Sequence, residues 1–179
     1  PLPAAAQKEG TSITVSALGR LTYARNPEAF ARLAQKLAAK YPSVEFLWIG
    51  TGELEDPLRS LISKSGLKKR FAVTGHIDRK EVLDRLARTD IFVHFSRWEG
   101  SPTVILEAMF FGKPVVASRI PGNEDLVIDG STGFLAADEA ELESATSRLI
   151  ESESLRRSLG ENGRRRLNEE FSLQKSVAA

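Results

Sequence analysis

Short apolar runs rich in β-branched and aromatic residues alternate along this chain with longer segments whose apolar residues recur at helical spacing. The expected strands cover residues 11–18, 44–49, 71–74, 90–95, 115–117 and 133–135. The expected helices cover residues 27–41, 57–65, 78–87, 103–111, 139–151 and 154–170. Strands joined by helices pair in parallel, and the helices cover both faces of the sheet. The alternation therefore predicts an α/β fold, a Rossmann-like three-layer α/β/α arrangement around a parallel sheet.

Composition excludes several classes of function. The 179 residues make about one ordinary domain. The 25 Lys and Arg residues balance 24 Asp and Glu residues, which argues against a general nucleic-acid binder. The absence of cysteine excludes disulfides and thiol nucleophiles, and two histidines are too few for most zinc sites. No acidic cluster indicates a dedicated metal site, and no apolar run approaches the roughly 20 residues of a membrane span.

Polar or glycine-rich loops follow four of the expected strands. In a parallel sheet, ligands bind outside the carboxyl ends of the strands, so these loops are the first place to look for a site. They are residues 19–25, 50–53, 75–76 and 96–101. The loop at 50–53 begins like a dinucleotide-binding fingerprint but lacks the third glycine and the later acidic residue. We interpret it as a tight strand-to-helix turn rather than an NAD site.

Two glutamates frame the start of the helix expected at Thr103. Glu99 lies in the preceding loop, and Glu107 lies in the second helical turn. Unpaired N–H groups from about Ser101 to Ile105 would make this helix start an anion site. The arrangement suits a ligand with a central diphosphate and a hydroxyl-rich group at each end. On spacing alone, however, two ordinary surface glutamates are the favoured interpretation, because such pairs are common.

Two arginines and two histidines complete the candidates taken from the residues alone. Arg20 and Arg25 follow the first strand and could neutralise a leaving phosphate, although a solvated loop is the simpler interpretation of such a pair. His76 either lines a nucleobase pocket or is merely exposed. His94 falls inside an apolar strand and is interpreted as a core or edge histidine rather than a catalyst.

Seven short segments occur in order along the chain: 19–21 with 25–26, 90–93, 96–100, 104–109, 112–118, 122–124 and 129–135. In order and spacing they resemble the C-terminal, donor-binding domain of GT-B-fold glycosyltransferases, especially glycosyltransferase family 4. The resemblance extends from Thr11 to Phe171. The E-x₇-E element of Glu99 and Glu107, followed by Ala-Met and Gly-Lys-Pro-Val-Val, is highly specific in combination. It favours functional roles for these glutamates and for Arg20.

The resemblance implies catalytic roles for Arg20, Arg25 and Glu99. Glu99 would contact the hydroxyls of the donor sugar, and Arg20 matches the family's phosphate-binding arginine. Arg25 stands where the family usually has a lysine, which keeps the charge but changes reach and geometry. Glu107 would hold the nucleotide ribose.

The other implied ligand contacts come largely from the strand-end loops. The base would lie beside Gly75 and His76, and backbone amides at the helix start would meet sugar or phosphate. With Glu107, the complete set of expected ligand-binding residues is Gly19, Gly75, His76, Gly100, Ser101, Thr103, Val104 and Glu107. Pro102 departs from the glycine-rich pattern of the family and removes one backbone donor.

The implied activity is that of a retaining glycosyltransferase without a bound metal or other cofactor. It would move a glycosyl group from a nucleoside-diphosphate sugar to an acceptor hydroxyl in polysaccharide, lipopolysaccharide or glycolipid synthesis. The expected location is cytoplasmic or peripheral at the inner membrane face, with a lipid-linked, membrane-associated acceptor and no nucleic-acid partner. The alternatives are another GT-B enzyme, either a sugar-nucleotide epimerase or a glycogen-synthase-like enzyme, and a non-catalytic interaction domain.

The expected domain organisation is a single ligand-binding unit with short flanks. Residues 1–10 are interpreted as a linker or cut end, 11–171 as the nucleotide-sugar-binding domain, and 172–179 as a shortened C-terminal segment. The N-terminal acceptor domain of the same polypeptide is expected to be missing, so the chain alone is predicted to be inactive. The late arginines, Arg156, Arg157 and 164–166, are interpreted as a solvated face, with an anionic membrane or a partner domain as the alternative.

Overall fold

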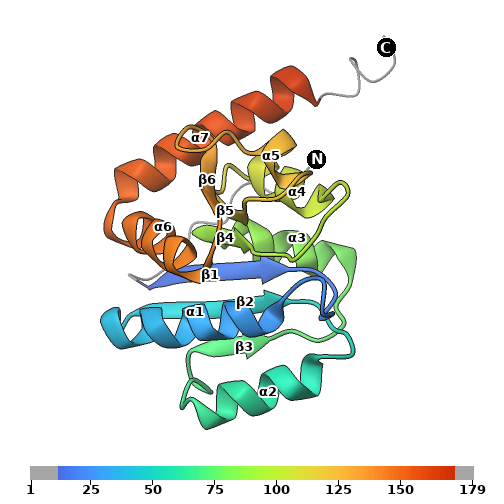
Figure 1. Ribbon diagram of the computed structural model, residues 1–179, viewed down its shortest axis with the longest axis vertical. Helices are drawn as coiled ribbons and strands as arrows, with labels where there is room; N and C mark the ends of the chain where they lie inside the picture. The colour runs from blue at the N-terminus through green and yellow to red at the C-terminus, as the bar shows by residue number, and fades with distance from the viewer. Residues whose placement is uncertain (1–11, 172–179) are drawn as a thin grey trace.

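A computed structural model describes residues 12–171 and shows one sheet with helices on both of its faces (Figure 1). The strands are β1 (Ile13–Leu18), β2 (Val44–Ile49), β3 (Phe71–Val73), β4 (Ile91–His94), β5 (Val115–Ser118) and β6 (Gly133–Ala136). The helices are α1 (Pro27–Lys40), α2 (Glu55–Lys64), α3 (Arg79–Ala87), α4 (Thr103–Phe110), α5 (Asn123–Leu126), α6 (Glu139–Glu151) and α7 (Glu153–Glu170). The expected linker at 1–10 and the shortened segment at 172–179 lie outside the described residues.

All six strands pair in parallel, in the order β3-β2-β1-β4-β5-β6. The predicted α/β fold with a parallel sheet is therefore confirmed. The chain builds outward from β1 to β3 and then returns to pair β4 with the other side of β1. The strand order reverses between β1 and β4, and the loops that leave such a point diverge and open a crevice at the carboxyl edge.

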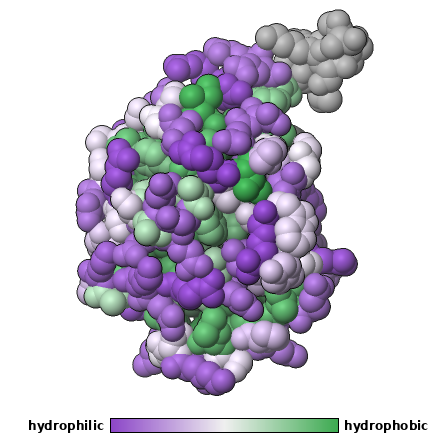
Figure 2. Space-filling view, in the orientation of Figure 1, coloured by the Kyte–Doolittle hydropathy of each residue, from purple (hydrophilic) through white to green (hydrophobic). Residues whose placement is uncertain are grey.

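Alternate strand residues face two separate helical layers, as β4 illustrates. Ile91 and Val93 join the core formed with α1, α2 and α6, whereas Phe92 joins the core formed with α3, α4 and α5. On the face drawn in Figure 1, hydrophilic residues cover most of the surface, with hydrophobic ones scattered between them (Figure 2). The apolar stripes of the helices are thus directed at the sheet, as their periodicity predicts.

Local signals account for most helix starts. Pro27 occupies the first turn of α1, and the Asp78 carboxylate accepts a hydrogen bond from the Glu81 N–H to cap α3, as the sequence predicts. The pattern predicts that the second helix starts at Pro57, but α2 starts at Glu55. Proline fits the first helical turn, where its missing N–H is not needed, so it marks the turn without marking the first residue.

Two further differences come from contacts made through space. Asp90 is expected inside the fourth strand but precedes β4, and its carboxylate accepts a hydrogen bond of 2.7 Å from the Thr14 N–H. The four-residue helix α5 is not expected from the sequence at all. Its four residues are too few to show a repeating pattern of apolar residues.

The late arginines divide between structural and exposed positions. Arg156 donates to the carbonyl oxygens of Leu149 and Ile150 at the end of α6, and Arg166 donates to the Asp125 carbonyl oxygen. Arg157 remains largely exposed, so the predicted solvated face holds for part of the set only. Within residues 12–171, no helix combines the length and the apolar character that crossing a membrane requires.

Candidate functional site

The loops that follow β1 and β2 touch backbone to backbone at the carboxyl edge of the sheet. Gly50 has a φ of 134°, and a Cβ there would lie 2.4 Å from the Gly19 carbonyl oxygen. The Gly19 N–H donates to Ile49, and the Trp48 indole donates to the Gly19 carbonyl oxygen. These contacts support the interpretation of residues 50–53 as a tight turn. They also fix the start of the loop that carries Arg20 and Arg25.

Arg25, His94 and Glu99 meet where the strand order reverses. Arg25 Nη1 forms an ion pair with Glu99 Oε1. His94 Nε2 lies 2.9 Å from Glu99 Oε1 and 3.1 Å from Arg25 Nη1. The Ser96 hydroxyl lies 3.2 Å from the same imidazole nitrogen. The loops after β1 and β4 thus bring a cation, a carboxylate and an imidazole into one cluster.

Burial and charge set the protonation states in this cluster. Burial alone would raise the pKa of Glu99, but hydrogen bonds with His94 and Ser96 and the charge of Arg25 outweigh it and hold that pKa below its usual value. Burial lowers the pKa of His94, against the opposing hydrogen bond and charge of Glu99. At neutral pH the cluster therefore holds an ionised carboxylate beside a neutral imidazole.

Arg97 ties the loop after β4 to the loop after β1. Its backbone N–H donates to the Ala24 carbonyl oxygen at 2.8 Å, and its Nη2 donates to Asn26 Oδ1 at 3.0 Å. Its guanidinium lies 4.2 Å from the centre of the Tyr23 ring, and the Tyr23 and Trp98 rings are 5.8 Å apart. These contacts join the two loops, and the joined loops carry two largely exposed aromatic rings.

Glu107 lies on α4 and faces the start of α3. Its Oε1 is 2.9 Å from Arg79 Nη1, and its Oε2 is buried without a hydrogen-bond partner among residues 12–171. A mainly apolar groove of about 380 Å³ opens beside the pair, lined by Arg79, Leu83, Thr103, Leu106, Glu107, Phe110, Phe111 and Leu167. A carboxylate oxygen that protein leaves unpaired is suited to accept hydrogen bonds from ligand hydroxyls.

The anion site expected at the start of α4 is smaller than the sequence predicts. The Thr103 N–H donates to the Ser101 carbonyl oxygen at 3.0 Å, and the Ile105 N–H donates to the Pro102 carbonyl oxygen at 3.0 Å. The expectation of unpaired N–H groups throughout Ser101 to Ile105 was therefore wrong. Pro102 takes the N-cap position with a ψ of 85°, and the turn around it satisfies these two amides.

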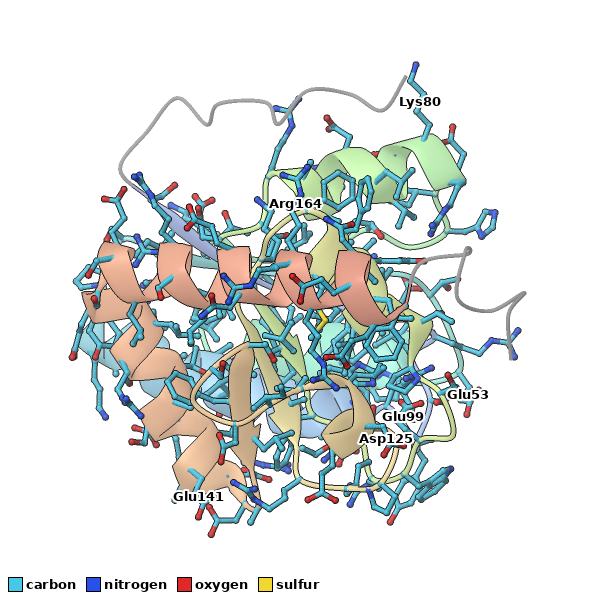
Figure 3. The ribbon with its side chains drawn as sticks, turned by 90° about the horizontal axis from the view of Figure 1, so that it is seen from above. Glu53, Lys80, Glu99, Asp125, Glu141 and Arg164 are labelled. Atoms are coloured by element: carbon cyan, nitrogen blue, oxygen red, sulfur yellow. The ribbon has the colours of Figure 1, made fainter. Side chains whose placement is uncertain are left out.

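The other expected residues lie on the same edge of the sheet. Arg20 is exposed after β1, and His76 is exposed after β3, where Gly75 forms an isolated bridge with Gly50. Gly100 and Ser101 are exposed in the loop that leads to α4. Seen from above, Glu53 and Glu99, which follow β2 and β4, lie toward the same side of the molecule (Figure 3). The structure thus gathers the expected residues along one edge, with Glu99 beside Arg25 and Glu107 beside Arg79.

Sequence reasoning missed two partners and undervalued a third residue. Arg79 begins α3 and Glu107 lies on α4, and the two meet across the groove that both helices line, so no sequence spacing signals that contact. The motif at 96–100 includes Ser96, but nothing in the motif indicates that its hydroxyl lies beside the His94 ring. His94 is buried in an interior strand, which confirms the core alternative over the edge one, but its place in an apolar strand gives no sign that its ring nitrogen contacts Glu99. No group of three or more His, Asp or Glu side chains in the described part of the chain is placed to hold a metal ion.

One family model matches nearly the whole chain. Its description is glycosyl transferases group 1, and it matches residues 2–166. The chain is 36% identical over 127 residues to an Escherichia coli UDP-Gal:alpha-D-GlcNAc-diphosphoundecaprenol alpha-1,3-galactosyltransferase. This match covers 69% of this chain and 32% of that protein. The chain is also 29% identical over 147 residues to an alpha-D-kanosaminyltransferase of Streptomyces kanamyceticus, and this match covers 81% of this chain and 38% of that protein. The chain spans between 21% and 40% of the first curated relatives that it matches.

Solved structures share the same fold. Anabaena HepE in complex with UDP-glucose matches with a TM-score of 0.83 at 26% identity, over 94% of this chain and 48% of that one. The C-terminal domain of LpcC, a glycosyl transferase group 1 family protein from Francisella tularensis, matches with a TM-score of 0.84 at 23% identity. That match covers 90% of this chain and 87% of the other, so a domain of this extent has been solved by itself.

Proposed function

Because the chain belongs to the glycosyl transferases group 1 family, we propose that it is the donor-binding domain of a retaining family 4 glycosyltransferase. The observation that carries this proposal is the cluster of Arg25 and Glu99 at the point where the strand order reverses. Ligands of open parallel sheets bind at such a point. The match to HepE, whose structure holds UDP-glucose, supports a nucleotide sugar as the ligand.

Each side of the donor would meet a different part of the site. Arg20 and Arg25 would bind the diphosphate, together with the backbone amides of Ser101 and Val104 and the positive end of α4. Glu99 would accept hydrogen bonds from the sugar hydroxyls. Glu107, through its unpaired Oε2, would accept hydrogen bonds from the ribose. The loop of Gly75 and His76 would border the base.

The proposed chemistry breaks the bond between the sugar C1 and the phosphate oxygen and forms a bond from C1 to the acceptor oxygen. The acceptor proton passes to the leaving phosphate oxygen on the same face, so this domain need not supply a base. Negative charge grows on the diphosphate as it leaves, and two arginines held at the carboxyl edge stabilise that charge. No metal ion is needed in this scheme.

The role of the whole protein is a further part of the proposal. The chain spans less than half the length of the curated relatives it matches, and the rest would supply the acceptor site across a cleft. The names of two relatives, a polysaccharide biosynthesis protein and a galactosyltransferase that acts on a diphosphoundecaprenol, support a role in polysaccharide or glycolipid assembly. A cytoplasmic enzyme at the inner membrane face, with a lipid-linked acceptor, fits that role.

Calorimetry on this chain tests the proposal. We expect UDP, GDP or ADP, or the matching nucleotide sugar, to bind, and Arg20→Ala and Glu107→Ala to weaken binding by about tenfold or more, which is roughly 1.4 kcal/mol. Arg164→Ala is a matched control, because Arg164 is an exposed arginine on α7 (Figure 3). Failure of every nucleotide to bind, or equal weakening by the control, would count against a donor site here.

A further inference from the structure

His94 is buried behind the proposed donor site, and none of the roles given above uses it. Its side chain is 3% exposed, and that of its neighbour Glu99 is 8% exposed. The imidazole stacks on Phe92 with 9° between the ring planes, and His94 pairs with Ala117 on β5. The backbone of His94 is therefore fixed by the sheet and its ring stacks on a neighbour in the same strand, while Arg25 and Glu99 reach its Nε2 from the loops.

The contacts of His94 assign its tautomer. Nε2 is 2.9 Å from Glu99 Oε1 and 3.1 Å from Arg25 Nη1, so it faces both an acceptor and a donor, and the Ser96 hydroxyl at 3.2 Å can act as either. A neutral imidazole nitrogen carries either a proton or a lone pair, and it cannot serve both neighbours. A lone pair on Nε2 would face the lone pairs of a carboxylate whose pKa is held low. The Nε2–H tautomer removes that repulsion and leaves Arg25 to pair with the carboxylate directly.

We propose that His94 is a positioning residue that fixes the Glu99 carboxylate for the donor sugar by donating from Nε2–H to Oε1. The inference rests on the proposed function of Glu99. Oε1 then receives hydrogen bonds from a group on the rigid sheet and from Arg25 on the loop after β1. Two donors on one oxygen set the rotation of the carboxylate, and a buried carboxylate that lost one of them would be free to turn. His94 thus acts on the sugar through Glu99 and does not touch it.

Binding measurements on four variants separate positioning from simple packing. We expect His94→Leu, which keeps an apolar side chain but no donor, to weaken UDP-glucose binding about tenfold while changing UDP binding little. His94→Gln, whose side-chain amide carries an N–H in reach of Oε1, should restore most of the loss. Because His94 acts through Glu99, the double variant His94→Leu/Glu99→Gln should bind UDP-glucose no more weakly than Glu99→Gln alone.

A second measurement needs neither a folded His94 variant nor a ligand. Imidazole ¹⁵N shifts of the unsubstituted chain should show the Nε2–H tautomer, and that preference should weaken in Glu99→Gln. An Nδ1–H tautomer, or losses that add in the double variant, would overturn the role of His94 while leaving donor binding intact. If neither UDP nor UDP-glucose nor any other nucleotide bound, the proposed function itself would fall, and the inference with it.

Discussion

Two buried side chains of the site, His94 and Glu99, have shifted pKa values that make the stability of the protein depend on pH. In the unfolded chain, His94 takes up a proton near pH 6.5, but burial lowers the pKa of His94 in the folded protein. The unfolded state then binds more protons, so stability falls as the pH drops below 6.5. The pKa of Glu99 is also lowered, so its contribution is present above 4.5 and is lost as the pH falls through the lower folded value.

Urea unfolding at about pH 7.5 and about pH 5.5 tests the first of these windows. We expect the free energy of unfolding to be lower at the acidic pH, because the unfolded chain takes up a proton at His94 that the buried imidazole of the folded protein does not. His94→Gln should remove much of this difference, because glutamine does not titrate. His76→Gln is the matched control, since His76 is the second histidine of the chain and is exposed. If the difference between the two pH values were unchanged in His94→Gln, the lowered pKa of His94 would not be its cause.

At the scale of elements, close packing of α7 against the end of α4 holds one side of the domain together. Gly160 lies in α7, and a Cβ there would be 2.0 Å from the Gly112 carbonyl oxygen. Gly163, on the same helix, faces the Met109 side chain, and its Cβ would be 3.3 Å from Cγ. The first contact is with backbone at a distance that no Cβ tolerates, whereas at Gly163 the shortest contact is with a side chain and the Thr132 carbonyl oxygen lies at 3.4 Å, an ordinary contact distance.

Alanine substitutions at these two glycines should therefore differ, although alanine favours a helix over glycine at both. We expect Gly160→Ala to lower the free energy of unfolding by about 1–3 kcal/mol through overpacking. Gly163→Ala should cost much less, because Met109 can adjust. Urea unfolding of both variants makes the comparison. Equal effects would show that α7 shifts as a whole and that the approach to Gly112 is not rigid.

At the scale of the whole molecule, the carboxyl edge of one sheet supplies one side of the proposed active site. The roles proposed for Arg20, Arg25, Glu99 and Glu107 all concern the donor. The groove and loops of this domain offer no assigned place for an acceptor, which the proposal gives to another part of the protein. This chain by itself should therefore bind the donor without carrying out the transfer.

The isolated chain is expected to bind a nucleotide sugar without transferring its glycosyl group. Incubation with radiolabelled UDP-glucose and a lipid-linked oligosaccharide, followed by chromatography, measures transfer, and calorimetry on the same sample verifies that donor binds. The same assay on a full-length relative provides the positive control. A glycosylated product formed by the chain alone would contradict the division of roles between domains.

Sequence patterns predicted the fold well because they reflect local physics. Periods of apolar residues placed all six strands, and Asp78 and Pro27 marked helix starts through their own hydrogen bonding and geometry. The short helix α5 was not predicted, because four residues are too few to show a helical spacing of apolar residues. The pattern around Glu99 and Glu107 placed the first glutamate in the loop after the fourth strand and the second on the helix that follows, but it could not show which amides the turn at Pro102 satisfies.

The sequence by itself determined the alternation of strands and helices, the parallel sheet and the loops that lie at its carboxyl edge. These follow from apolar periodicity and from the rule that strands joined by helices run parallel. Only the tertiary structure decided that Arg25 pairs with Glu99, that His94 stands behind both and that Arg79 meets Glu107. These residues lie far apart in sequence or on different elements, and their contacts depend on strand order and helix packing, which no local pattern encodes.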